Sequence, residues 1–201
     1  MTASELLEPE SYFDRTFQCR AWKLLPGQYH VGGREAMLVT VLGSCVSACL
    51  YDSGAGIGGM NHFMLPSSEL GGATGGSVPA RLGIHAMELL INALVRQGAR
   101  RSSLRAKIFG GGAVLQGLTA SNVGERNAEF ALTYLRTEGI PVVAQDLLDV
   151  FPRKIYFFPG TARVMVRKLR KVDSDLVRNA ERAYAESLRN APVAGDVELF
   201  A

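Results

Sequence analysis

Short apolar runs recur along the chain and predict a β-rich core. Residues 36–42 form an aliphatic and β-branched run, and residues 46–51 and 57–64 continue in the same way. Runs of this length, bounded by glycine or polar turns, are typical of buried strands. Further strand candidates of the same kind occur at residues 29–32, 107–109, 140–144, 154–158 and 162–166.

Three longer segments carry apolar residues at helical spacing. The first begins at Pro79 and ends at Gly98, with apolar positions recurring every three or four residues. Proline at the first turn and glycine after the last are typical of helix ends. A second helix is predicted over residues 127–138, capped by Asn122 or Asn127. A third begins at Asp173 or Ser174 and presents an apolar stripe formed by Leu176, Val177, Ala180, Tyr184 and Leu188.

Strands interspersed with helices predict one α/β domain with mixed strand pairing. The chain has 201 residues, of which 47% are hydrophobic, enough for one buried core. We expect a flexible N-terminus over residues 1–11, a domain over 12–171, a packed C-terminal helix over 172–191 and a tail over 192–201. The glycine-rich residues 66–77 are predicted to form a loop that acts either as a lid or as a plain connector.

Charge and cysteine content narrow the functional classes. The net charge is +3, and the basic residues are dispersed without interleaved aromatic residues, so nucleic-acid binding is not favoured. Three cysteines, an odd number, argue against a disulfide framework. Glu5, Glu8 and Glu10 lie where a signal peptide would need an apolar core, and no apolar run approaches the length that spans a bilayer. We expect a cytoplasmic protein with reduced thiols and no membrane insertion.

The candidate chemistry lies where the run 36–42 stops. Gly43 and Ser44 break the strand, Cys45 follows at the turn, and His62 lies in the next strand but one. A thiol nucleophile needs a nearby base, and adjacent strands can bring the two side chains together. Backbone N–H groups of residues 43–45 are then candidate oxyanion donors. The alternatives remain a cysteine buried as a small hydrophobe and a histidine with a structural hydrogen bond.

Two kinds of cofactor site can be weighed from the sequence. Cys45 and Cys49 have a spacing seen in zinc sites, but the other possible ligands, Cys19, His30, His62 and His85, are scattered. The glycine run 110–112 lacks the Lys-Ser/Thr ending of a phosphate-binding loop, so close backbone packing explains it better. We therefore expect neither a metal nor a cofactor.

Several ordered motifs resemble one family. Leu42-Gly-Ser-Cys-Val-Ser-Ala-Cys-Leu-Tyr-Asp52 followed by Gly59-Met-Asn-His-Phe-Met-Leu-Pro66 is similar to the signature of CheD, the chemoreceptor glutamine deamidase of bacterial chemotaxis. Ala106-Lys-Ile-Phe-Gly-Gly-Gly-Ala113, Val123-Gly-Glu-Arg-Asn127 and Arg153-Lys154 resemble later motifs of the family. The resemblance covers roughly residues 12–170, and several motifs at fitting spacing are more specific than any one of them.

The resemblance implies site residues and a fold. It implies Cys45 as nucleophile, His62 as base and Thr40, on the preceding strand, as a third catalytic residue. We expect an imidazolium at His62 to lower the pKa of the Cys45 thiol below its free value of about 8.5. The implied fold is a layered domain with helices on one side of the sheets, similar to the catalytic domains of cytotoxic necrotizing toxins.

The resemblance also implies partners, and one motif departs from the family. Methyl-accepting chemotaxis receptors are the implied protein substrates, a CheC-type phosphatase is an implied partner, and receptor methylesterase activity is a plausible second reaction. Relatives usually carry a Gly-Gly pair after an aspartate where this chain has Asp146-Leu-Leu-Asp149. That difference keeps open a second hypothesis, a non-catalytic adaptor that binds receptors or the phosphatase.

Overall fold

Two mixed β-sheets and three α-helices make up the computed structural model, which describes residues 8–65, 78–113, 123–169 and 171–190. The predicted glycine-rich loop 66–77, the tail 192–201 and most of the N-terminal segment lie outside the described residues. Asn122 does so too.

The first sheet has the strand order β1-β2-β4-β9-β10. Its strands are β1 (Glu10–Asp14), β2 (Cys19–Lys23), β4 (Ala36–Leu42), β9 (Arg153–Phe158) and β10 (Arg163–Lys168). Strands β2 and β4 run parallel, whereas the other neighbours are antiparallel. This sheet carries β4, at whose end the candidate nucleophile lies.

The second sheet has the order β3-β6-β5-β7-β8. Its strands are β3 (Tyr29–Gly32), β6 (Ile57–Asn61), β5 (Val46–Asp52), β7 (Arg105–Gly110) and β8 (Val142–Leu147). Only the pair β7 and β8 is parallel among the described neighbours. Because β5 and β6 are antiparallel neighbours, the start of β5 and the end of β6 lie at the same end of these two strands.

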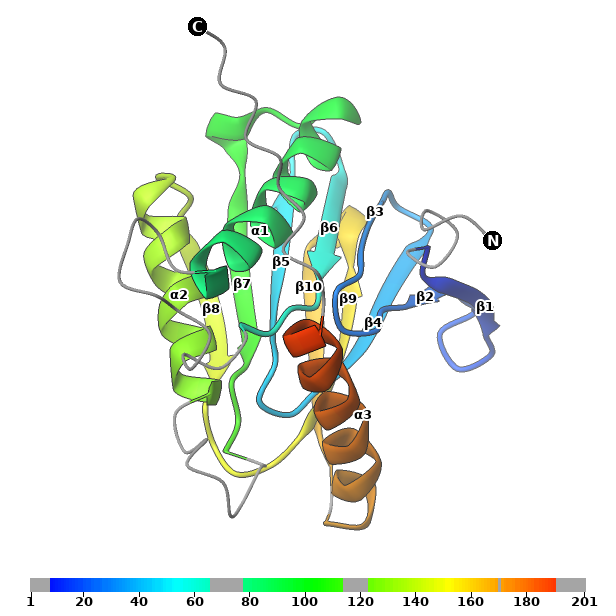
Figure 1. Cartoon of the computed structure of the whole chain (residues 1–201). Helices are drawn as coiled ribbons and strands as arrows, with labels where there is room; N and C mark the ends of the chain where they lie inside the picture. Colours follow the sequence, from blue (N-terminus) through cyan, green and yellow to red (C-terminus); the bar gives the residue numbers. More distant parts are fainter. Residues whose placement is uncertain (1–7, 66–77, 114–122, 170, 191–201) are drawn as a thin grey trace, which may run out of the picture.

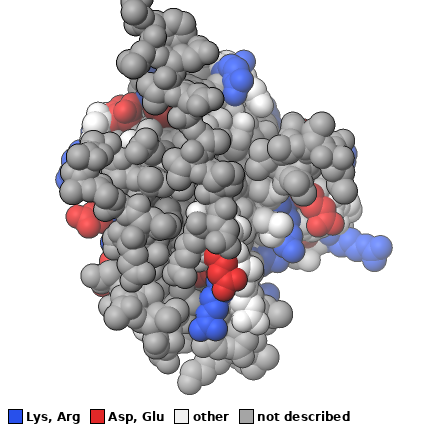
Figure 2. Space-filling view, in the orientation of Figure 1, with Lys and Arg blue, Asp and Glu red and all other residues white. Residues whose placement is uncertain are grey.

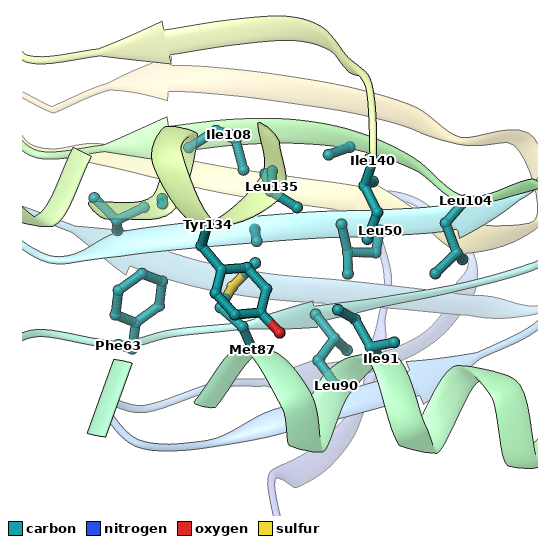
Figure 3. Packing of buried hydrophobic residues seen from close by; sticks show 14 of the residues in the cluster. Leu50, Phe63, Met87, Leu90, Ile91, Leu104, Ile108, Tyr134, Leu135 and Ile140 are labelled. Carbon is teal, nitrogen blue, oxygen red and sulfur yellow. The ribbon is translucent and has the colours of Figure 1, made fainter. Parts of the chain in front are cut away.

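Helices α1 (Val78–Arg96) and α2 (Val123–Thr137) pack on one face of the second sheet (Figure 1). Figure 3 shows Leu90 and Ile91 of α1 and Leu135 of α2 in one cluster with Leu50 of β5. Each fully buried aliphatic side chain of this kind stabilises the fold by about 1.5–3 kcal/mol. Gly83 lets α1 pack closely against Phe130 of α2, because a Cβ at Gly83 would lie 2.5 Å from the Phe130 ring.

The two sheets pack face to face through a second cluster. Leu38, Leu42 and Phe157 of the first sheet meet Cys49 and Met60 of the second, and all are buried. The layers therefore run helices, second sheet, first sheet. Strand β4 is buried on both faces, which explains its continuous apolar run, since buried strands need no polar alternation.

The third helix, α3 (Lys171–Asn190), lies apart from α1 and α2. It is drawn orange to red in Figure 1, and residues of α3, β4 and β9 line one cavity. Tyr184 and Ala185 pack against the cluster between the sheets. The expectation of helices on one side thus holds for α1 and α2, whereas α3 covers the region around the start of β5.

Most predicted elements are present, but several boundaries differ and two strands were not predicted. The chain also forms β1 and β2, whose polar and half-exposed residues hide their period. Strand β6 ends at Asn61, so His62 follows the strand instead of lying within it. Helix α2 begins at Val123, which places Asn127 inside the helix and makes the prediction that it is a cap wrong. Helix α3 begins at Lys171, before the predicted caps Asp173 and Ser174.

Short 3₁₀ turns complete the connections at Arg101–Ser103 and Pro159–Thr161. Within the described ranges, none of the helices is long and apolar enough to span a membrane. Figure 2 shows the described basic and acidic side chains interspersed on one face of the molecule.

Candidate active site

The turn between β4 and β5 places Cys45 beside the end of β7. Its backbone is held by the N–H of Gly111, which donates to the Cys45 carbonyl at 2.8 Å, and by the N–H of Gly112, which donates to the Gly43 carbonyl at 2.7 Å. Gly110 has φ +110°, and a Cβ there would lie 2.2 Å from the Cys45 carbonyl oxygen. The glycine run therefore serves close packing against the turn, as the sequence predicts.

Pairing between β5 and the segment after β6 brings His62 to Cys45. Val46 and Phe63 form an antiparallel pair and exchange both backbone hydrogen bonds, at 3.0 and 2.9 Å. Cys45 and His62, which precede them on the chain, therefore lie diagonally across this pair on the same face, and the Cys45 sulfur lies within 4.8 Å of a His62 ring nitrogen. Cys45 is 0% exposed and His62 is 2% exposed. The two residues singled out in the sequence are thus adjacent and closed off from solvent.

Thr40 fixes the orientation of His62. Its hydroxyl donates to the Leu24 carbonyl at 2.9 Å, and its Oγ1 lies 2.8 Å from His62 Nδ1. A hydroxyl has one proton, and that proton points to Leu24, so Oγ1 accepts from Nδ1–H. The free lone pair of His62 is then on Nε2, which has no hydrogen-bond partner among the described groups. This is the tautomer that a base acting on Cys45 requires.

Glu181 of α3 completes the site, and sequence reasoning missed it. Its Oε1 accepts from the backbone N–H groups of Gly43 at 2.9 Å and Cys45 at 3.0 Å. Its Oε2 accepts from the N–H of Ser44 at 2.9 Å and from the Ser44 hydroxyl at 2.8 Å. The three backbone donors predicted to serve an oxyanion thus converge on one buried carboxylate, which is separated from Cys45 by 136 positions along the chain.

A signal for Glu181 exists in the sequence. It lies four residues after Val177 and three before Tyr184, so a helical wheel places this acidic residue within the apolar stripe of the last helix. An acid at such a position is buried and needs hydrogen-bond partners. The periodicity thus marks Glu181, but only the fold reveals that its partners belong to the turn at Cys45.

Asn127 ties the nucleophile turn to the segment after the base. Its Nδ2 donates to the Ser44 carbonyl at 2.8 Å, and its Oδ1 accepts from the Leu65 N–H at 2.8 Å. Asn127 is 0% exposed. Its amide therefore has a structural role, and it links α2 to both halves of the site.

The closed arrangement keeps the thiol and the imidazole neutral. Burial raises the pKa of Cys45 well above its ordinary value, and the negative charge of Glu181 and a hydrogen bond to it raise this pKa further. Burial lowers the pKa of His62 to about 4, although the charge of Glu181 and the Leu24 carbonyl oppose that shift. The expected thiolate–imidazolium pair is therefore not formed here, because both groups are desolvated and an anion lies beside the thiol.

Cys45, His62 and Glu181 are also the described residues most able to bind a metal. One donor atom of each lies within 4.8 Å of the others. However, each carboxylate oxygen of Glu181 already accepts two hydrogen bonds from the turn. The donor set therefore fits a hydrogen-bonded carboxylate better than a metal ligand. Cys49, whose spacing from Cys45 in the sequence made the two a possible zinc-ligand pair, is buried and is not part of this cluster.

A cavity of about 620 Å³ adjoins the site. Thr40, His62 and Glu181 are among the residues that line it. Its remaining described lining comes from β1, β2, β4, β9, β10, α3 and the segments after β2 and β10, with the basic side chains Lys23, Lys154 and Arg167. The cavity gives a space next to the base that a substrate side chain could enter.

The loop that departs from the family pattern keeps an unusual backbone. Leu148 and Asp149 have φ values of 65° and 76°, which glycine adopts more readily. The fully buried Arg153 holds the loop, since its guanidinium donates to the Asp146 carboxylate at 2.5 Å and to the Leu148 carbonyl. The loop thus follows a conformation suited to Gly-Gly without having glycines.

Comparison with known proteins places the chain among relatives of similar length. A family model described as "CheD chemotactic sensory transduction" matches residues 64–168. A protein of Dechloromonas aromatica named "Probable chemoreceptor glutamine deamidase CheD 1" is 56% identical over 98% of this chain and 96% of its own. A "Probable chemoreceptor glutamine deamidase CheD" of Methylobacillus flagellatus is 54% identical over 98% of this chain and 97% of its own.

Among solved structures, a Neisseria meningitidis protein assigned to DUF152 is similar over 65% of this chain and 64% of its own, with 9% identity and a TM-score of 0.41. The sequence relatives extend over nearly the whole chain at more than half identity. The chain therefore belongs to the CheD family.

Proposed function

We propose that this protein is a chemoreceptor glutamine deamidase that hydrolyses receptor glutamine side chains to glutamate through a Cys45 thioester. The relatives' names support the reaction and the receptor substrate. The observation that carries the proposal is geometric: a thiol, an unpartnered imidazole nitrogen and a cradle of N–H donors converge, and the cradle holds a carboxylate, the group that the reaction produces.

In the first half of the reaction, the substrate carboxamide takes the place of the Glu181 carboxylate. Its oxygen accepts from the N–H groups of Gly43 and Cys45, and these donors stabilise the negative charge that develops on it. His62 Nε2 removes the thiol proton as sulfur attacks the carbonyl carbon. The tetrahedral adduct then collapses, the C–N bond breaks, and His62 returns the proton to the leaving ammonia.

In the second half, water hydrolyses the thioester. His62 Nε2 takes a proton from water, hydroxide adds to the thioester carbon, and the C–S bond breaks to give glutamate and the Cys45 thiol. Thr40 keeps the imidazole in the required tautomer throughout. The same thioester forms from a glutamate methyl ester with methanol as the leaving group, so methylesterase activity belongs to this proposal.

The proposal extends to partners, location and fold relationship. We propose a cytoplasmic enzyme that acts on methyl-accepting chemotaxis receptors and docks with a CheC-type phosphatase. We further propose that the layered domain over residues 12–171 is related to the catalytic domains of cytotoxic necrotizing toxins. No metal or cofactor enters any step, because the thiol, the imidazole and the backbone donors supply nucleophile, base and oxyanion stabilisation.

Peptide mass spectrometry of a receptor cytoplasmic fragment tests the proposal. Incubation with the protein should raise particular glutamine-containing peptides by about one mass unit, as hydrolysis of an amide requires. Cys45→Ala should abolish the change, whereas Cys49→Ala, a matched change at a second buried cysteine, should retain it. A fragment that binds the protein yet stays unmodified would reject the enzyme and leave a non-catalytic adaptor.

A further inference from the structure

Helix α3 seats one inward-facing acid on the nucleophile. Glu181 is 2% exposed, whereas Arg182 and Glu186 of the same helix are exposed. Tyr184 packs close to the Gly27 turn, because a Cβ on Gly27 would lie 2.9 Å from the Tyr184 hydroxyl. The helix therefore lies over the turn that carries Cys45 and leaves that residue 0% exposed.

The position of the Glu181 carboxylate is the one that a reacting side chain needs. Its Oε1 uses the N–H groups of Gly43 and Cys45, which are the donors assigned to the substrate carbonyl. Two groups cannot occupy these donors together, so no substrate amide binds while Glu181 is seated. A glutamate side chain in that place is also chemically identical to the product of glutamine hydrolysis.

We propose that α3 is an internal product mimic that closes the active site. We propose further that a substrate helix carrying the target glutamine docks in the groove that α3 now occupies, beside the cavity lined by Thr40, His62 and Glu181, after α3 has left it. The docking of a substrate helix rests on the deamidase function proposed above, whereas the closure by α3 does not. The chain thus carries its own inhibitor, and activity depends on the equilibrium between seated and released α3.

The groove indicates the chemistry of the helix that replaces α3. Lys23, Lys154 and Arg167 line the cavity beside α3, and Glu181 is the sole acid among the described residues that line it. A helix with acidic residues flanking its glutamine complements these cations. The observed occupant is itself a helix, which shows that the groove accommodates that shape.

Release of Glu181 also activates the thiol. The Glu181 charge and its hydrogen bond raise the pKa of Cys45, and departure of the carboxylate removes both effects. A neutral carboxamide in the same place does not restore the charge. Closure by α3 therefore blocks the site in two ways, since it occupies the oxyanion donors and keeps the nucleophile protonated.

The rival explanation is that Glu181 is a permanent structural clamp for the turn. Thiol labelling in the full-length chain separates the two. In the unmodified protein, Cys45 should react with iodoacetamide as slowly as the buried Cys49. Glu181→Ala should speed labelling of Cys45 by at least about tenfold, which corresponds to about 1.4 kcal/mol, while Cys49 stays slow. Glu186→Ala, an exposed acid on the same helix, should change neither rate. Unchanged Cys45 labelling in folded Glu181→Ala would overturn the closure.

A second variant keeps the test decisive if Glu181→Ala unfolds and exposes Cys49 as well. Glu181→Gln places a carboxamide over Cys45 with almost no change in shape. Attack by sulfur expels ammonia and forms an internal thioester, whose intact mass is about 17 units below that of the Glu181→Gln variant. Hydrolysis of this thioester gives glutamate, whose intact mass is about one unit above that of the same variant. Either change should occur in Glu181→Gln and be absent from Glu181→Gln combined with Cys45→Ala.

The outcomes separate the two proposals. A carboxamide that persists in Glu181→Gln, while the same variant deamidates a receptor fragment, would show that α3 does not mimic a reacting side chain. Faster Cys45 labelling in Glu181→Ala without any deamidation of receptor or of the introduced amide would uphold closure by α3 and reject the deamidase function.

Discussion

Replacement of Thr40 by valine tests how the base is held. Valine has nearly the shape of threonine but lacks the hydroxyl that donates to Leu24 and accepts from His62. The change leaves a buried carbonyl and a buried imidazole N–H without partners. Each such orphan costs about 1–3 kcal/mol, so Thr40→Val should lower the free energy of unfolding by about 2–6 kcal/mol.

Urea denaturation measures this loss directly. For a slope of about 2 kcal/mol per molar, the midpoint should fall by about 1–3 M. The turnover rate on a receptor fragment should fall by about 10²–10⁴, the range for loss of an oriented general base, because His62 is then free to rotate or to change tautomer. The effect should fall on kcat more than on KM, since Thr40 positions the base and not the substrate.

Thr40→Ser is the matched control, because serine keeps the hydroxyl and loses only a methyl group. Its loss should be about 1 kcal/mol, and its turnover should remain within about tenfold of the unmodified protein. A Thr40→Val protein that unfolds at the original urea concentration and keeps its turnover would refute the hydrogen-bond chain from Leu24 through Thr40 to His62.

Four further perturbations test other parts of the structure. Burial lowers the pKa of His62 to about 4, whereas the unfolded residue titrates near 6.5. The unfolded state therefore takes up a proton first as the pH falls from about 6.5 towards 4, and the free energy of unfolding should drop by about 2 kcal/mol between about pH 7 and pH 5. His62→Asn should flatten this pH dependence when unfolding is measured in urea. Asn127→Ala should lower the free energy of unfolding, measured in urea, by about 2–6 kcal/mol because it orphans a buried carbonyl and a buried N–H. Asn92→Ala, at an exposed position of α1, should lower it by at most about 0.5 kcal/mol. Equal losses would reject the linking role of Asn127. Leu148→Gly should raise the free energy of unfolding by about 0.5–1 kcal/mol, measured by calorimetry, because it relieves a φ of 65°. Val150→Gly, measured in the same way, should lower the free energy of unfolding. Prolonged treatment with a strong chelator should leave the deamidation rate unchanged, and a loss that added zinc restores would instead assign the buried thiol, imidazole and carboxylate to a metal.

The strand pattern and the Cys45/His62 pair could be predicted from sequence for a physical reason. The buried strands β4 and β5 are continuous apolar runs, and the glycine that separates them breaks the pattern at the functional turn. Adjacent strands in the chain usually pair with each other or with near neighbours, so the prediction that His62 meets Cys45 needed little long-range information.

The elements that the sequence did not reveal are those with little periodicity of their own. Strands β1 and β2 have largely exposed or half-buried residues. Strand β1 pairs with β2, and β2 pairs with β4, so both depend on the surrounding sheet. Asn127 is of a residue type that is favoured at helix N-caps. Only the tertiary contacts show that its amide links Ser44 to Leu65.

Glu181 shows the same limit most clearly. Its place in an apolar helical stripe predicts burial, but a stripe does not say which surface it covers. The identity of its partners depends on how α3 folds back over a turn that is 136 residues away. Contacts at that separation follow from the packing of whole elements and not from local pattern.

The central claim is that Cys45 carries the glutamyl group as a thioester. Hydroxylamine competes with water for such an intermediate, so its addition during turnover should convert target receptor glutamines to hydroxamates, about 16 mass units heavier. The account predicts this product with the unmodified protein and its absence with Cys45→Ala. Deamidation that yields no hydroxamate at high hydroxylamine, or hydroxamate formation that persists in Cys45→Ala, would contradict a thioester at Cys45.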